Sequence, residues 1–262
     1  MITPNKDIRR TILQIVHNSG AAHIGSALSM VEILNAIFKS VDLEKIKNKD
    51  SDRDRIILSK GHATSGLYAL MFHHGLLSEQ ELNTYFKNDS LLAGHTSHHV
   101  PHVEHSTGGL GHGLPVGLGM AIGAKSKKLG LNVFVVVGDG ELHEGSNWEA
   151  IMLAGTLKAG NLIVFVDING LSQVGEVEKC CSLEPLKLRF ESFGFNAFDV
   201  DGHDENEICK IIHKSKTALK PTAILCHTIK GRGISFMENN NLWHYRCPQG
   251  DDYEKALLEL KE

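Results

Sequence analysis

The chain has 262 residues and a formal net charge of −4, with 22% charged and 42% hydrophobic residues. These are ordinary values for a globular protein, and the bulk charge gives no indication of a nucleic-acid or membrane partner. No apolar run approaches the ~18 residues of a membrane span, no charged-then-apolar leader opens the chain, and the five cysteines form no C-x-x-C pair. We therefore expect reduced thiols, a cytoplasmic protein, and one large domain over residues 1–262.

The first half of the chain carries signals for helices and one short strand. Apolar residues recur at helical spacing between Ile8 and Val16, and the pattern stops near Gly20. Ser78, with Glu81 three residues later, forms a capping box that begins a short helix ending near residue 86. The remaining predictions are a strand at 55–58, helices at 30–41 and 63–74, and a glycine-rich loop that enters a helix at 107–123.

The second half of the chain alternates strands with helices. Three continuous apolar runs, at 133–137, 162–166 and 222–226, are typical of fully buried strands in a parallel sheet. Helical patterns accompany them at 148–158, 185–193, 205–219 and 252–260. The alternation predicts an α/β fold, with a largely parallel central sheet and helices on both faces.

Polar clusters follow two of these strands. Gly138-Asp139-Gly140 ends the first run, and Asn169 lies beyond the second, 30 residues after Asp139. Open α/β sheets bind ligands at the carboxyl ends of their strands. Carboxylate, amide and carbonyl oxygens suit Mg²⁺, so we expect Asp139, Asn169 and the Leu171 carbonyl to hold Mg²⁺, or else Ca²⁺ or Mn²⁺. Gly138 and Gly140 let the backbone approach a diphosphate, although Gly-Asp-Gly alone is also a common tight turn.

The two clusters together resemble the thiamine diphosphate motif, and the residues after the aspartate resemble its transketolase form. Residues 138–145 are Gly-Asp-Gly-Glu-Leu-His-Glu-Gly, and companion segments follow the family's order over the entire chain. These companion segments lie at 22–25, 59–63, 93–95, 107–113, 230–233 and 243–248. The chain is most similar in extent to the N-terminal subunit of a split transketolase.

The resemblance implies a thiamine-diphosphate-dependent transfer of a two-carbon ketol unit from a ketose to an aldose. It also implies a single diphosphate-binding domain here and a partner chain that carries the pyrimidine-binding and C-terminal domains, in an α2β2 assembly. That partner would supply the glutamate that activates the cofactor, so this chain alone would be inactive.

Site residues also follow from the resemblance. His62 matches a histidine that contacts the cofactor diphosphate, and His244 matches one near both phosphate and substrate. His23 and His95 match histidines that line the substrate channel. Glu144 matches a buried glutamate that links the two active sites of the dimer. The alternative is that the histidines are structural and that Glu144 is a surface residue at a helix N-terminus.

Three further positions match the part of the site near the cofactor rings. Gly109 and Leu110 match the segment that approaches the thiazolium and aminopyrimidine, although a plain helix entrance would also explain them. His112 stands where many full-length enzymes have glutamine, and either side chain can contact the cofactor.

The departures from the family pattern lie beside the channel. The family's His-Pro pairs are His23-Ile24 and His95-Thr96 here, and its Trp-His-Gly-Lys becomes Trp243-His244-Tyr245-Arg246. We therefore expect an acceptor other than ribose 5-phosphate, bulkier or modified, with an anionic group near Arg246. Neutral drift on a loop would also explain these departures.

Three rival functions remain. A deoxyxylulose-phosphate-synthase-like enzyme shares the domain, but residues 141–149 and 230–233 favour transketolase. A non-catalytic cofactor-binding partner is disfavoured by the intact Asp139, Asn169, His62 and His244. A plain nucleotide-binding Rossmann domain is disfavoured because no G-x-G-x-x-G follows the first strand of a βαβ unit.

Overall fold

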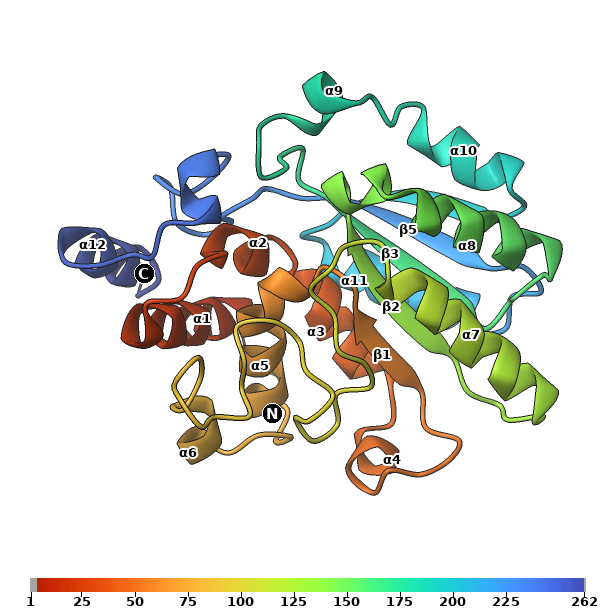
Figure 1. The fold of residues 1–262 in the computed structure, drawn as a ribbon, viewed down its shortest axis with the longest axis horizontal. Coiled ribbons are helices and arrows are strands. Elements are labelled where there is room, and N and C mark those ends of the chain that lie inside the picture. The colour runs from red at the N-terminus through yellow and green to blue at the C-terminus, as the bar shows by residue number, and fades with distance from the viewer. Residues whose placement is uncertain (1–3, 262) are drawn as a thin grey trace.

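The structure, a computed structural model, describes residues 4–261 and is built on a parallel five-stranded sheet with the strand order β1-β2-β3-β5-β4 (Figure 1). The strands are β1 (Arg55–Leu58), β2 (Val133–Gly138), β3 (Leu162–Ile168), β4 (Asn196–Asp201) and β5 (Thr222–His227). The α/β fold with a parallel sheet, predicted from the sequence, is confirmed. Because all five strands run in the same direction, their carboxyl ends lie along one edge, and Gly138 of β2 is paired in register with Asp167 of β3.

Helices cover both faces of the sheet because alternate residues of each buried strand point to opposite sides. In β2, Phe134 and Val136 pack into one apolar cluster, whereas Val133 and Val135 pack into the other. Figure 1 shows α7, α8 and α10 on one side and α1, α2, α3 and α5 on the other. The first group comprises α7 (Gly113–Ser126), α8 (Gly145–Thr156) and α10 (Leu186–Ser192). The second comprises α1 (Asn5–Ser19), α2 (Ile24–Ser29), α3 (Val31–Ser40), α5 (Thr64–His73) and α11 (Glu205–Ser215), with α12 (Asp251–Glu259) against α1.

The short elements differ most from the sequence predictions. The capping box of Ser78 and Glu81 is present, but its helix α6 (Glu79–Leu82) ends earlier than expected. The helix predicted at 205–219 ends at Ser215. The strand β4 and the helices α2, α4 (Leu43–Lys47) and α9 (Val177–Cys180) were not predicted. Within residues 4–261, no helix is both long enough and apolar enough to span a membrane.

Candidate active site

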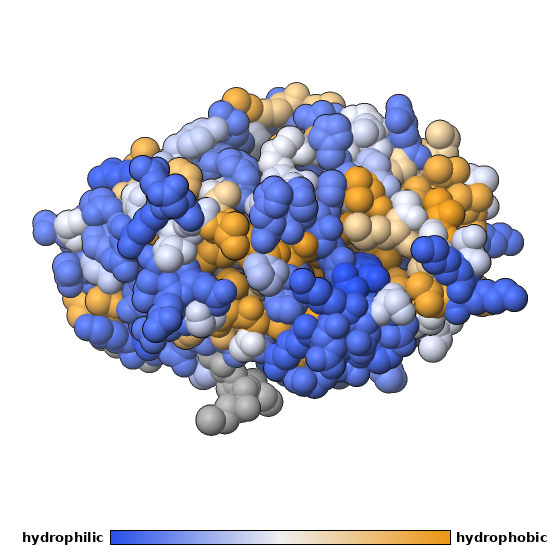
Figure 2. Space-filling model, turned by 60° about the horizontal axis from the view of Figure 1, so that its bottom comes forward, coloured by the Kyte–Doolittle hydropathy of each residue, from blue (hydrophilic) through white to orange (hydrophobic). Residues whose placement is uncertain are grey.

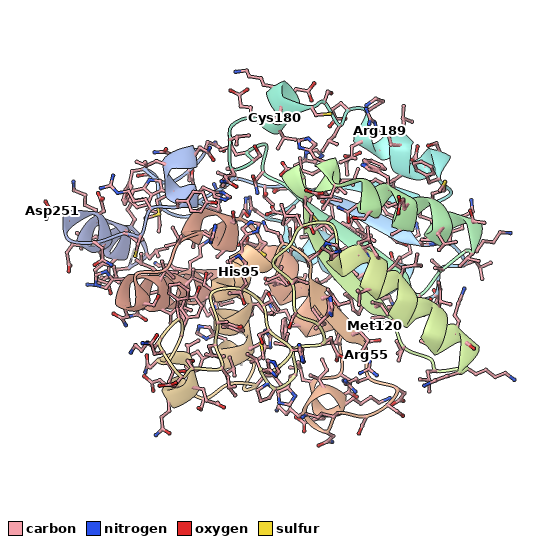
Figure 3. All side chains as sticks on the ribbon, viewed as in Figure 1. Arg55, His95, Met120, Cys180, Arg189 and Asp251 are labelled. Atoms are coloured by element: carbon pink, nitrogen blue, oxygen red, sulfur yellow. The ribbon has the colours of Figure 1, made fainter. Side chains whose placement is uncertain are left out.

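A cavity of about 350 Å³ opens at the carboxyl ends of the strands. Of the predicted site residues, it is lined by His23, His62, His95, Leu110, Gly138, Asp139, Gly140, Asn169, Leu171 and His244. The labelled residues His95 and Cys180 in Figure 3 mark two sides of this cavity. The structure therefore brings together residues that are up to 221 positions apart in the chain, from His23 to His244.

Asp139 is a buried carboxylate held by the backbone. Its side chain is at the turn after β2, and its two oxygens accept hydrogen bonds from Gly140 N at 2.7 Å and Gly170 N at 2.6 Å. The residue is only 4% exposed. Burial, with the nearby charge of Asp167, raises the pKa of Asp139 to about 6. A carboxylate whose charged form is disfavoured in this way gains from a nearby cation.

Asn169 and Leu171 supply the other oxygens expected to hold a cation. The Asn169 amide nitrogen donates a hydrogen bond to Asp167 Oδ2 at 3.2 Å. Its amide oxygen, Oδ1, accepts a hydrogen bond from Leu171 N at 3.2 Å, so the orientation of the amide is fixed. The Leu171 carbonyl accepts a hydrogen bond from Lys230 Nζ at 3.1 Å. A carbonyl oxygen has two lone pairs, so this bond leaves one available.

A buried ion pair between Lys60 and Asp167 lies beneath these residues, and the sequence pattern gave no sign of it. Asp167 is fully buried on β3 and accepts hydrogen bonds from Lys60, from Ser29 Oγ at 2.6 Å and from Thr228. Burial alone would raise the pKa of Asp167, but the charge and hydrogen bond of Lys60 outweigh it and lower the pKa. Since Asp167 also binds the Asn169 amide, this pair positions a predicted cation ligand.

Four of the predicted histidines form a cluster in the cavity. The ring centroid of His23 lies 5.3 Å from that of His62, 5.8 Å from that of His95 and 5.1 Å from that of His244. Burial, together with neighbouring lysines and histidines, lowers the pKa of His23 to about 4, that of His244 to about 3, and that of His62 well below its usual value. These imidazoles are therefore neutral near pH 7, so proton exchange there needs a bound anion to raise their pKa.

The predicted role of Glu144 between the two active sites of a dimer stays a prediction, because that role concerns contacts with a second subunit. Glu144 is exposed at the N-cap of α8 and does not line the cavity. The buried glutamate is Glu141, 2% exposed, which accepts hydrogen bonds from Ser59 Oγ, from Gly111 N at 3.1 Å and from Gly138 N at 3.1 Å. The sequence prediction did not include Glu141, because its burial depends on contacts with residues 59 and 111, which lie far from it along the chain.

The remaining predicted residues lie at the outer edge of the cavity. Gly109 and His112 are exposed and outside the cavity lining, although a Cβ on Gly109 would lie 3.3 Å from the His112 ring. Tyr245 lines the cavity and is 57% exposed, with its ring centroid 5.2 Å from that of His23. Arg246 does not line it. Its guanidinium binds Asp252 at 2.8 Å and lies over the Trp243 ring, so the expected free anion site at Arg246 is not supported.

Comparison with known proteins identifies the domain. Residues 4–257 match the family described as "Transketolase, thiamine diphosphate binding domain". The chain belongs to the transketolase family. It is thus a transketolase-type transferase domain that binds thiamine diphosphate, and the sequence-based resemblance is confirmed.

The relatives include proteins named as a transketolase subunit, which this chain covers almost entirely, and proteins named as transketolase, which it covers to about two fifths. The chain is 40% identical over 260 residues to an apulose-4-phosphate transketolase subunit of Actinobacillus succinogenes, covering 98% of this chain and 94% of that protein. It is 33% identical over 258 residues to a 6-deoxy-6-sulfo-D-fructose transketolase subunit of Clostridium sp. (strain MSTE9), covering 97% and 94%. The transketolase structure from Campylobacter jejuni superposes with a TM-score of 0.89 and 28% identity, covering 98% of this chain. This chain spans 42% of that structure.

Proposed function

We propose that this chain is the diphosphate- and metal-binding subunit of a two-chain transketolase, which transfers a two-carbon ketol unit from a ketose to an aldose. The observation that carries the proposal is the pair of oxygens at adjacent strand ends, Asp139 and Asn169, facing the same cavity. The names of the relatives support a two-chain enzyme, because several of them are named as one subunit of a transketolase. The five free cysteines support a cytoplasmic location.

The residues present fit a metal–diphosphate group. Asp139 is a buried carboxylate whose pKa is raised by burial and by Asp167, so a divalent cation beside it would stabilise its charged form. A Cβ added to Gly138 would have no neighbouring atom closer than 4.0 Å, so the backbone there leaves room for a bound group. We propose Mg²⁺ held by Asp139, Asn169 and the Leu171 carbonyl, and a diphosphate held by His62, His244 and the backbone of Gly140.

Thiamine diphosphate supplies the carbanion and the electron sink that ketol transfer needs. The side chains of this chain then bind, orient and exchange protons. His62 and His244, being neutral, donate single hydrogen bonds to phosphate oxygens. His23 and His95 face the same cavity and can donate to or accept from the hydroxyl groups of a sugar.

An apolar outer surface supports the presence of a partner. Helices α7 and α8 cover the sheet with their inner sides, yet large apolar side chains also lie on their outer sides. These exposed residues are Ile122, Met152, Leu153 and Leu157. Apolar patches are visible in Figure 2 on the right, the side on which α7 and α8 lie in Figure 1. We propose that the second subunit, carrying the pyrimidine-binding domain, covers this surface in an α2β2 assembly.

The metal assignment can be tested by titration calorimetry of thiamine diphosphate with Mg²⁺ on the two-chain complex. Asp139→Ala and Asn169→Ala should each weaken cofactor binding by at least about 100-fold, because each removes one oxygen from a small coordination shell. The far-ultraviolet circular dichroism should not change, since the site lies at strand ends. His213→Ala, on the surface of α11, is the matched control. Unchanged affinity in both site variants would refute the ligand assignment.

A further inference from the structure

The side chains of Lys230 and His244 meet within the buried wall of the cavity. Lys230 Nζ lies 3.0 Å from His244 Nδ1, and the two residues are 1% and 8% exposed. An ammonium group carries three N–H donors and no acceptor. His244 Nδ1 must therefore accept this hydrogen bond, and it can do so only without a proton of its own.

We propose that Lys230 is a positioning residue that fixes His244 in the tautomer with its proton on Nε2. Nε2 is on the opposite edge of the ring from the Lys230 contact, and His244 lines the cavity. His244 would then present one fixed N–H donor to a bound oxygen, which is the group that a phosphate or a sugar carbonyl requires. The consequence for catalysis rests on the proposed function, whereas the tautomer itself does not.

Lys230 is held in place by contacts at its ammonium and along its turn. Besides His244, Nζ contacts the Leu171 carbonyl at 3.1 Å and Asn241 Oδ1 at 3.4 Å. The backbone that follows Lys230 is bound as well. Gly231 N donates to Gly25 O at 3.0 Å, and Arg232 O accepts from Arg9 Nε at 2.9 Å. The ammonium therefore has little freedom to leave Nδ1.

A second histidine, His203 between β4 and α11, is bound to the backbone of the same turn and is fixed in the opposite tautomer. The Ile229 N–H donates to His203 Nε2 at 2.9 Å, so the proton of His203 must be on Nδ1. From there it donates to Glu32 Oε2, 3.0 Å away, and Glu32 is also bound by both terminal nitrogens of Arg9. His203 and His244 thus provide an internal comparison. The His203 tautomer is set by a backbone N–H, and the His244 tautomer by an ammonium group, which Lys230 keeps near pH 7 although burial lowers its pKa to about 8.

Nitrogen-15 NMR of the imidazole rings in the isolated chain tests the proposal, with His203→Gln and His244→Gln used to assign the signals. We expect the wild-type chain to show His244 protonated on Nε2 and His203 protonated on Nδ1. Lys230→Met, which keeps the apolar stem but removes the donor, should give His244 a mixture of tautomers and leave His203 unchanged. Lys255→Met, on the exposed face of α12, is the control.

The proposal is overturned if wild-type His244 carries its proton on Nδ1, an outcome that does not depend on the Lys230→Met variant. It is also overturned if a folded Lys230→Met chain keeps the wild-type tautomer. Because the spectra are recorded without cofactor, substrate or partner, they stand even if the chain proves not to be a transketolase subunit. In an active two-chain complex, Lys230→Met should weaken cofactor binding by about 10-fold or more, the usual effect of losing a residue that orients a ligand.

Discussion

The floor and the rim of the cavity differ in burial and in the number of partners that this chain provides for their side chains. We define the floor as Lys60, Asp139, Glu141 and Asp167, and the rim as Val174 and Tyr245. Every floor residue is at most 4% exposed, and each has charged or hydrogen-bonding partners. Every rim residue is exposed. On the proposed function, we expect this chain to bind the diphosphate end of the cofactor by itself and the substrate end to need a second surface.

The largest expected effect is on the free energy of unfolding, when one member of the ion pair in the floor is removed. Lys60→Met leaves Asp167 as an uncompensated buried charge and should lower the free energy of unfolding by about 3–5 kcal/mol. The matched control is Lys187→Met, whose ion pair with Asp199 is 45% and 44% exposed and should contribute about 0–1 kcal/mol. Urea unfolding followed by circular dichroism measures both. Equally small losses of stability in the two variants would mean that the buried ion pair contributes no more than an exposed one.

The ion network that holds the Lys230 turn should contribute stability that depends on pH. Burial acts to raise the pKa of Glu32, but the hydrogen bonds from His203 and Arg9 outweigh it and lower the pKa to about 2. Because the folded pKa is below the ordinary 4.5, the contribution is complete above pH 4.5 and is lost as the pH falls through about 2. The shift corresponds to about 3 kcal/mol.

Glu32→Gln tests this contribution. The variant should be about 3 kcal/mol less stable than the wild type at pH 7, and the difference should narrow between pH 4.5 and 2. Chemical unfolding at a series of pH values measures it, and Glu44→Gln on the exposed side of α4 serves as the control. A difference that is independent of pH would show that Glu32 acts through packing alone.

The smallest expected effect comes from substitutions at or near the rim, which should change only the substrate specificity. Tyr245→Gly should change the ratio of kcat/KM between ribose 5-phosphate and modified aldoses by several-fold, because the ring borders the cavity beside His23. Arg246→Lys should leave that ratio unchanged, since Arg246 is paired with Asp252 outside the cavity. Competition assays on the two-chain complex decide between them. If Arg246→Lys changed the ratio strongly and Tyr245→Gly did not, the expectation of an anionic acceptor group near Arg246 would be supported instead.

The buried strands were predictable because continuous apolar runs identify them. Strand β4 was missed because it is an edge strand in which only Ala197 and Val200 are buried and polar residues interrupt the apolar ones. Helix α2 was missed for the opposite reason. All six of its residues are buried, so it has no polar face to give a periodic signal.

The site was predictable where one short motif carries the chemistry and not where distant residues combine. Asp139 and Asn169 were found because their strand-end positions are visible in the sequence. Lys60 and Asp167 are 107 residues apart, and no local pattern connects them. Glu141 was missed for the same reason, since its burial depends on residues far along the chain.

We propose that this chain by itself provides the floor of the cavity, whereas the rim needs a second chain before ketol transfer can occur. The most direct test is a ketol-transfer assay with thiamine diphosphate and Mg²⁺, using this chain by itself, the partner chain by itself, and the two mixed. We expect transfer only in the mixture, with activity that saturates at equal amounts of the two chains. Transfer by this chain alone at a rate comparable to that of the mixture would contradict the account.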